Sequence, residues 1–242
     1  MRHTGKSQMI TVPSWVIPGT YIENLRFLED KNISGIELLF FIYDSDVKAL
    51  FQKEFMSISE YRNRFIFTAH LPDALNAECE ALVQCLAPLV RHFIVHPAKF
   101  ENAHKQAELL LSWFSKYGKE KFLIENTRHG FMENILSMLP ADTGICIDTG
   151  HLLLDNVSVI DHYKKYCGRI KEIHLHALDI EQAKIDNRLV DHRALRADDA
   201  WFKEFLPELK QYSGIINTEV FSWEEAKKSL EVLHECGITT SK

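Results

Sequence analysis

The chain has 242 residues, of which 46% are hydrophobic and 26% charged, a composition typical of one globular domain with a sizeable apolar core. Its net charge of −6 disfavours non-specific binding to nucleic acid, which needs a basic surface. The five cysteines are scattered without a C-x-x-C pair, and no segment approaches the roughly 20 apolar residues of a membrane span. We therefore expect a cytoplasmic protein with neither a disulfide framework nor a membrane partner.

Short apolar runs recur along the whole chain. Most are continuous rather than alternating, which is typical of strands that are covered on both faces, as in parallel sheets. The runs span residues 9–17, 35–42, 64–70, 92–97, 121–127, 144–150, 170–178 and 214–221.

Helical patterns lie between these runs. Apolar residues at i, i+3 and i+4 spacing predict helices over 73–89, 102–118 and 198–212, the second ending at Gly118. The last helix begins with Ser222 and Glu225 in capping-box spacing and closes on Gly237. One polar stretch, at about 179–198, interrupts the pattern, and its length and composition predict a functional loop.

Strands that alternate with helices at intervals of roughly 25–35 residues predict a single (β/α)8 TIM barrel over residues 1–242. A doubly wound open sheet is the alternative. It is disfavoured because no G-x-G-x-x-G follows any of the expected strands.

Acidic and imidazole side chains stand at the carboxyl ends of these strands, where a TIM barrel builds its active site. Any one of these residues, considered alone, is most often an ordinary surface or helix-capping residue. Asp148 in particular could cap the next helix. The set comprises Glu37, His70, His96, Glu125, Asp148, His151, His174, His176 and Glu219, with His192 in the loop that follows the seventh strand.

Together these residues predict a metal site. A buried carboxylate is costly unless it is paired or bound to a metal, and nearly every strand delivers one of these groups to the same rim. Mixed His and Asp/Glu ligands suit Zn²⁺, Mn²⁺ or Fe²⁺, and the number of candidates allows one to three ions. Gly150, between Asp148 and His151, is expected to let the chain turn into the next helix.

The motifs "FLIENT", "CIDTGH", "IHLHAL" and "NTEVF" resemble the last four strand signatures of the xylose isomerase-like TIM barrels. That superfamily includes sugar isomerases and epimerases and the endonuclease IV type of apurinic endonuclease (AP endonuclease family 2). The resemblance covers essentially the whole chain. It implies that Glu125, Asp148, His174 and Glu219 hold a central metal, with His151 beside Asp148.

Two chemistries of the superfamily differ in the ligands they need. A sugar isomerase or epimerase uses one metal and two opposed carboxylates, here Glu125 and Glu219. An endonuclease IV-like enzyme needs further imidazoles, which His70, His96 and His192 would supply. The endonucleases carry D-x-H in the last loop, whereas Asp191 directly precedes His192 here. The acidic net charge makes DNA the least favoured substrate.

A third group fits the motifs better. "SWVIPGTYIENLRFLEDKNISGIELLFF", "TAHLP", "HLHAL", "DHRAL" and "TEVFS" resemble the cobamide-remodelling phosphodiesterases of this superfamily, in which the loop reads D-H-x-x-L. The resemblance implies hydrolysis of the phosphodiester in the nucleotide loop of a cobamide. Two departures are a longer loop and Ala177 where glycine is expected.

The resulting prediction is a metal-dependent phosphodiesterase acting on a small molecule, with an isomerase or epimerase as the alternative. A barrel that only binds a ligand is disfavoured because every central ligand is present. The roles expected are catalysis by Glu125, Glu219 and His151; metal binding by Glu125, Asp148, His174, Glu219, His151, His96, His70 and His192; and substrate contact or support of the ligands by Glu37, His176 and Asp191.

Overall fold

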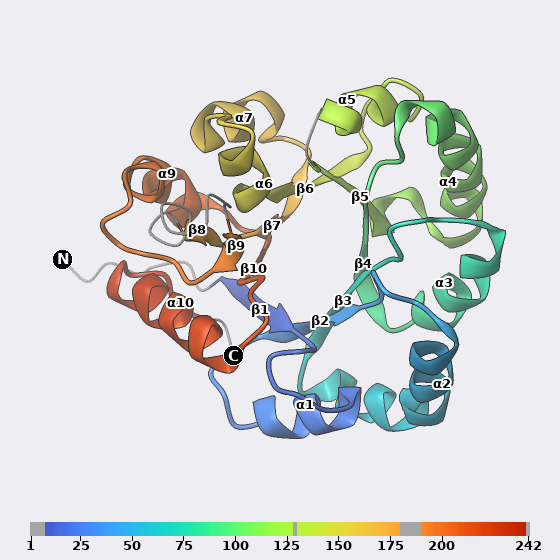
Figure 1. The fold of residues 1–242 in the computed structure, drawn as a ribbon, viewed down its shortest axis with the longest axis horizontal. Helices are drawn as coiled ribbons and strands as arrows, with labels where there is room; N and C mark the ends of the chain where they lie inside the picture. The colour runs from blue at the N-terminus through green and yellow to red at the C-terminus, as the bar shows by residue number, and fades with distance from the viewer. Residues whose placement is uncertain (1–7, 128–129, 180–189, 241–242) are drawn as a thin grey trace.

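A computed structural model of the chain describes residues 8–127, 130–179 and 190–240. Eight parallel strands close into a barrel in the order β1-β2-β3-β4-β5-β6-β7-β10, and helices surround it (Figure 1). The predicted (β/α)8 barrel is confirmed. Its strands are β1 (Met9–Pro13), β2 (Gly35–Leu39), β3 (Ile66–His70), β4 (Val90–Val95), β5 (Phe122–Glu125), β6 (Gly144–Asp148), β7 (Ile170–His174) and β10 (Ile215–Asn217).

The outer layer of helices follows the expected alternation. It consists of α1 (Tyr21–Leu28), α2 (Ser45–Glu60), α3 (Glu80–Leu86), α4 (Ala103–Tyr117), α5 (Phe131–Leu136), α6 (Thr149–Leu154), α7 (Val159–Tyr166), α9 (Ala200–Gln211) and α10 (Trp223–Glu235). Short 3-10 turns join several elements: η1 (Tyr61–Asn63), η2 (Ala77–Cys79), η3 (Phe100–Asn102) and η4 (Lys119–Lys121). None of these described helices is long and apolar enough to cross a membrane.

The helix predicted over 73–89 is shorter than expected. Asn76 caps the 3-10 turn η2 by accepting a hydrogen bond from Glu78 N at 2.8 Å, and the α-helix itself begins only at Glu80. It ends at Leu86, two residues before Pro88, which has no amide hydrogen to continue the helix. The residues before Asn76 are thereby left free to form the loop that follows β3.

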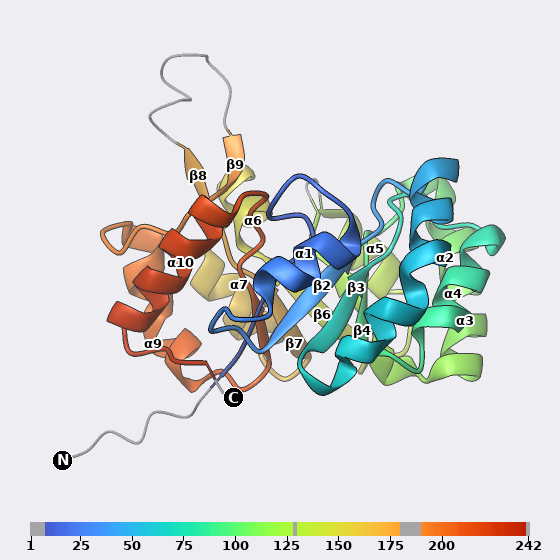
Figure 2. The ribbon, with the colours of Figure 1, turned by 90° about the horizontal axis from the view of Figure 1, so that it is seen from below.

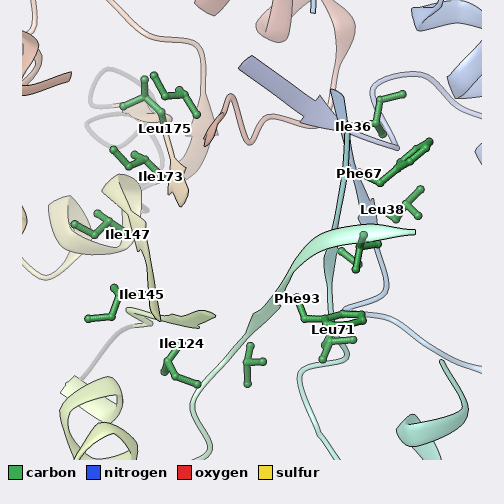
Figure 3. Close-up of a cluster of buried hydrophobic side chains, with 14 of the residues drawn as sticks. Ile36, Leu38, Phe67, Leu71, Phe93, Ile124, Ile145, Ile147, Ile173 and Leu175 are labelled. Atoms are coloured by element: carbon green, nitrogen blue, oxygen red, sulfur yellow. The ribbon is translucent and has the colours of Figure 1, made fainter. Parts of the chain in front are cut away.

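Strand residues alternate between two different buried surroundings. The outward-facing side chains pack under the helices, and Figure 3 shows Ile36, Phe67, Ile124, Ile145 and Ile173 among them. Facing inward, Ile94, Leu123 and Cys146 form a separate apolar cluster. The inward positions nearer the strand ends hold acids and imidazoles. The strands read as continuous apolar runs because both faces are buried, and polar residues enter only at the carboxyl end of the inner face.

Part of the expected loop at 179–198 is an antiparallel hairpin. Strands β8 (Ala177–Asp179) and β9 (Val190–Arg193) pair outside the barrel sheet, and Figure 2 shows them standing at one end of the barrel. Residues 180–189, which complete the predicted loop, lie outside the described residues. Asp191 and His192 belong to β9, so the hairpin carries both of them towards the carboxyl ends of the strands.

Two of the predicted helix ends are confirmed and one is different. Gly118 and Gly237 follow α4 and α10 with φ of 93° and 81°, in the region that favours glycine. Ser222 caps α10 by accepting from Glu225 N at 3.3 Å. The predicted capping box is wrong, because the Glu225 carboxylate accepts from Ala194 N at 2.6 Å and not from the backbone N–H of Ser222. Glu225 thus anchors the chain that leaves β9.

Candidate metal centre

The carboxyl ends of β5, β6 and β7 bring three predicted ligands together inside the barrel. Oxygens of Glu125 and Asp148 and a ring nitrogen of His174 lie within 4.8 Å of one another. Glu219, just after β10, adds its Oε2 at 3.1 Å from His174 Nδ1, and Glu125 Oε2 lies 3.7 Å from the same nitrogen. All four side chains are buried. The four residues predicted to hold the central metal therefore converge on one point, which we call the central group.

The central group contains buried polar atoms that make no hydrogen bond. Among the described residues these include both carboxylate oxygens of Glu125, His174 Nδ1 and Glu219 Oε2. An unsatisfied buried donor or acceptor costs on the order of 1–3 kcal/mol, so a cluster of them is expensive without a partner. Carboxylate oxygens and an imidazole nitrogen are the ligands that Zn²⁺, Mn²⁺ and Fe²⁺ accept. The donor set therefore fits a divalent cation.

Glu37 fixes the orientation of His174. His174 Nε2 donates to Glu37 Oε2 at 3.1 Å, and Asn217 Nδ2 donates to Glu37 Oε1 at 2.8 Å. Thr68 Oγ1 also donates to Glu37 Oε2, at 3.3 Å. The hydrogen bond from His174 Nε2 to Glu37 selects the His174 tautomer whose Nδ1 is available to a cation. Glu37 was expected to touch substrate or to support a ligand, and its complete burial is consistent with the supporting role.

Asp148 combines the two roles considered for it. Its Oδ1 accepts from His151 N at 2.6 Å and caps α6, while its Oδ2 accepts from His176 Nε2 at 3.0 Å. Each oxygen keeps a second lone pair for a cation. The capping interpretation and the ligand interpretation are therefore compatible, because the cap holds the carboxylate still.

A second group of ligands shares Glu125 with the central group. His70 Nε2 and His96 Nε2 lie 3.1 Å apart and at 3.3 Å and 3.4 Å from Glu125 Oε2. Their other nitrogens are occupied, since His70 Nδ1 donates to Leu71 O at 3.0 Å and His96 Nδ1 lies 2.8 Å from Asp73 Oδ1. Both rings thus present Nε2 to the same point. We call His70, His96 and Glu125 the histidine group.

A third possible group, His176, His192 and Glu219, is better suited to support than to metal binding. Both nitrogens of His176 are occupied, Nε2 by Asp148 and Nδ1 by the backbone N–H of His192 at 3.0 Å. Neither ring nitrogen of His176 is therefore free for a cation. His192 Nδ1 donates to Glu219 O at 2.9 Å, and its φ of 52° is unusual for a residue other than glycine.

Gly150 has a different role from the one expected. Its backbone is helical, within α6, and its φ is not positive. A Cβ at this position would overlap the imidazole of His176. The absence of a side chain therefore makes room for the ring that holds Asp148, and no special turn is required.

His151 lies at the edge of both groups. Its Nδ1 donates to Asn126 O at 3.2 Å and lies 3.5 Å from Glu125 Oε1 and 3.6 Å from Asp148 Oδ2. Burial lowers the pKa of His151, but Asp148 and Glu125 outweigh that effect and raise it to about 10. Its Nε2 is left for a cation or for a substrate. Asp191 is partly exposed, with Oδ2 at 4.0 Å from His192 Nε2.

The buried charges of the site balance one another through imidazoles. Burial raises the pKa of Glu125, but His96 and His174 outweigh it and lower that pKa well below its ordinary value. Burial also opposes the ionisation of Asp148 and Glu219, and neighbouring imidazoles again lower both pKa values. For Glu37, burial outweighs His174 and raises the pKa.

Three supporting residues were not predicted. Asn126 clamps the end of β6, accepting from Asp148 N at 2.8 Å and donating to Asp148 O at 2.9 Å. Asp73 holds His96, and Glu172, on the same strand face as His174, lies close to Glu37 and His174 inside the barrel. The period-2 alternation of β7 could have revealed Glu172. Asp73 lies in a loop, where no periodic signal exists.

Solved structures with the same fold cover nearly the whole chain. A sugar phosphate isomerase/epimerase from Parabacteroides distasonis superposes with a TM-score of 0.58 and 12% identity over 95% of this chain and 96% of that one. A second sugar phosphate isomerase/epimerase from the same organism superposes with a TM-score of 0.61 and 9% sequence identity over 98% of both chains. A xylose isomerase-like TIM barrel/4-hydroxyphenylpyruvate dioxygenase fusion protein superposes with a TM-score of 0.61 and 12% sequence identity, over 95% of this chain and 43% of that one.

No protein-family model matches the sequence, and no curated protein matches it. At these identities the structural similarity shows the fold, which is that of the xylose isomerase-like TIM barrels. Two of these neighbours are named as sugar phosphate isomerase/epimerases. The resemblance to cobamide-remodelling enzymes is not shown by these neighbours.

Metal binding is predicted to release protons. Burial lowers the pKa of His96, but Glu125 and Asp73 outweigh it and raise that pKa to about 10, as for His151. At about pH 8 the His96 imidazole therefore carries a proton in metal-free protein, and a cation bound by the histidine group must displace that proton. Calorimetric titration with Mn²⁺ in buffers of different ionisation enthalpy should show proton release, and the affinity should rise from about pH 7 to 9. Heats independent of the buffer would contradict this.

Substitution of Gly150 is predicted to weaken metal binding. In Gly150→Ala the new methyl group displaces His176, which loses its hold on Asp148. Loss of such a supporting contact costs roughly 10–100-fold in metal affinity. The matched control is Gly168→Ala, where a Cβ meets nothing within 4 Å. Mn²⁺ affinity and the melting temperature are measured for both variants, and equal Mn²⁺ affinities in folded Gly150→Ala and wild-type protein would disprove the role of Gly150.

Proposed function

We propose that this barrel is a metal-dependent phosphodiesterase and that its substrate is the nucleotide loop of a cobamide. The observation that carries the hydrolytic proposal is the shared carboxylate of Glu125. Its Oε2 lies 3.3 Å and 3.4 Å from the Nε2 atoms of His70 and His96 and 3.7 Å from His174 Nδ1. A carboxylate common to two ligand groups suits two neighbouring cations, the arrangement that phosphodiester hydrolysis uses.

The residues divide the work as follows. Bound cations would neutralise the phosphate and lower the pKa of a water. Glu125, Asp148, His174 and Glu219 would hold one cation, and His70, His96 and Glu125 would hold the other. Glu37, Asp73, Asn126 and His176 keep the ligands oriented. His151, with its Nδ1 fixed by Asn126 O and its pKa raised, is suited to give a proton to the leaving oxygen.

The cobamide part of the proposal rests on the sequence motifs alone. "TAHLP" contains His70, and "DHRAL" contains Asp191 and His192. The hairpin of β8 and β9 carries "DHRAL" to the rim, where His192 contacts Glu219. The motif is therefore close enough to the candidate metal centre to act on the same substrate.

An isomerase or epimerase is the second candidate. Glu125 and Glu219 flank His174 Nδ1, which suits a reaction in which one carboxylate removes a proton and the other returns it. The names of the similar solved structures support this chemistry more directly than they support hydrolysis. It requires one cation and gives no metal-binding role to His70 or His96.

The experiment measures metal content and turnover together. Protein reconstituted with Mn²⁺ is incubated with coenzyme B12 and, separately, with a ketohexose and its phosphate. We expect about two cations per chain and release of the α-riboside from the cobamide. His96→Ala should lose one cation and at least about a hundredfold of the hydrolysis, because it removes a ligand of the histidine group.

His104→Ala is the control, since that histidine is on the outer surface of α4 and 82% of its side chain is exposed. It should retain both the metal content and the turnover of the wild type. One cation per chain together with epimerisation of the ketose would overturn the phosphodiesterase in favour of the second candidate.

A further inference from the structure

Aromatic side chains line one side of the barrel mouth. Trp15 follows β1, Phe41 follows β2 and Phe221 follows β10, and these three strands are neighbours in the barrel (Figure 1). Ring centroids lie 5.5 Å apart for Trp15 and Phe41 and 6.0 Å apart for Phe41 and Phe221. We call these three residues the aromatic wall.

The aromatic wall is continuous with the candidate metal centre at two points. Phe41 contacts His70 edge-on, with ring centroids 6.0 Å apart. Phe221 packs on His192 with centroids 4.6 Å apart, and His192 in turn stacks on His176 at 4.3 Å. A ligand held at Glu125 thus has the wall beside it.

The aromatic wall is accessible to a ligand. Phe221 is 41% exposed, and Trp15 and Phe41 are half-buried. Ile42, next to Phe41, is 54% exposed and widens the apolar surface. Single exposed apolar residues are common on proteins, but a contiguous set beside a buried cluster of metal-binding groups is typical of a binding site.

The backbone behind the aromatic wall is held in place. Asn24 Oδ1 accepts from Val16 N at 3.0 Å and from Ile17 N at 3.1 Å, which fixes the loop that carries Trp15. Val16 O accepts from Trp223 N at 2.7 Å, which ties that loop to the segment that carries Phe221. A surface ordered before binding loses little conformational entropy when a ligand stacks on it.

The ring of Trp15 is also held by packing against the buried core. Trp15 packs on Tyr21 with ring centroids 6.3 Å apart, and the Tyr21 hydroxyl donates to Leu39 O at 2.8 Å. Tyr21 is fully buried and makes further ring contacts with Phe40 and Phe51. The wall is therefore an extension of the packed core, and its rings present fixed faces to the mouth.

We propose that the aromatic wall is a subsite for a planar aromatic or heteroaromatic ring of the substrate. The assignment rests on the proposed function only in that the ring is joined to the phosphate that is hydrolysed; stacking itself needs no reaction. Stacking of a base on an aromatic side chain changes affinity by roughly tenfold, and ribose 5-phosphate has no planar π-face that could stack in this way. The substrate class is thereby a phosphate ester that bears a planar ring.

The test compares two ligands that differ only in the ring. Adenosine 5′-monophosphate and ribose 5-phosphate are titrated calorimetrically into Mn²⁺-loaded protein. The expected result is an affinity for the nucleotide about tenfold higher than that for the sugar phosphate. Equal affinities, or no binding of either ligand, would overturn the subsite.

Variants assign the preference to the wall. Phe221→Leu and Phe41→Leu keep an apolar side chain but lose the ring face, and each should remove most of the preference while ribose 5-phosphate binds as before. Phe221→Tyr should retain it. Leu111→Ala, an exposed residue on α4, is the control and should bind both ligands as the wild type does. Since Phe221 is exposed, its variants are expected to fold even if Phe41→Leu does not.

The outcome is separable from the proposed reaction. If the preference persists while coenzyme B12 is not hydrolysed, the subsite stands and the phosphodiesterase fails. If hydrolysis occurs but Phe221→Leu keeps the full preference for the nucleotide, the subsite fails and the reaction stands.

Discussion

Four carboxylates are buried at the carboxyl end of the barrel, and the rest of the site depends on compensating their charge. Glu37, Glu125, Asp148 and Glu219 have relative exposures of at most 4%. Their ion pairs among the described residues are all with histidines. Isolated buried charges of this kind would be strongly destabilising. The imidazoles offset part of that cost, and the oxygens of Glu125 and Glu219 that accept no hydrogen bond leave a place that a divalent cation fits.

The barrel strands have an apolar outer face and, at their carboxyl ends, polar residues on the inner face. Outward-facing residues such as Phe67, Ile124 and Ile147 pack under the helices and supply the apolar burial (Figure 3). Inward-facing residues at the strand ends are free to be polar. Supporting contacts then hold each ligand, as Glu37 holds His174 and Asn126 holds the backbone of Asp148. The positions of Glu125, Asp148 and His174 are thus built into the sheet register.

Sequence periodicity was sufficient to predict the barrel and the convergence of the strand-end carboxylates and imidazoles. Short strands ending in Glu125, Asp148 and His174 share one rim in any parallel barrel, so their convergence follows from the topology. Which nitrogen of each histidine faces the centre could not be predicted, because it depends on partners distant in sequence, such as Asp73 for His96. The role of Gly150 was missed for the same reason, since its neighbour, the His176 ring, comes from the segment that follows β7.

The central claim is that Glu125 is shared by two metal sites. It is tested most directly by anomalous diffraction from crystals soaked in Mn²⁺ or Zn²⁺. The account predicts two peaks, one near Asp148, His174 and Glu219 and the other near His70 and His96, both within coordination distance of Glu125. A single peak in the central group, with the two Nε2 atoms of His70 and His96 free of metal, would contradict it.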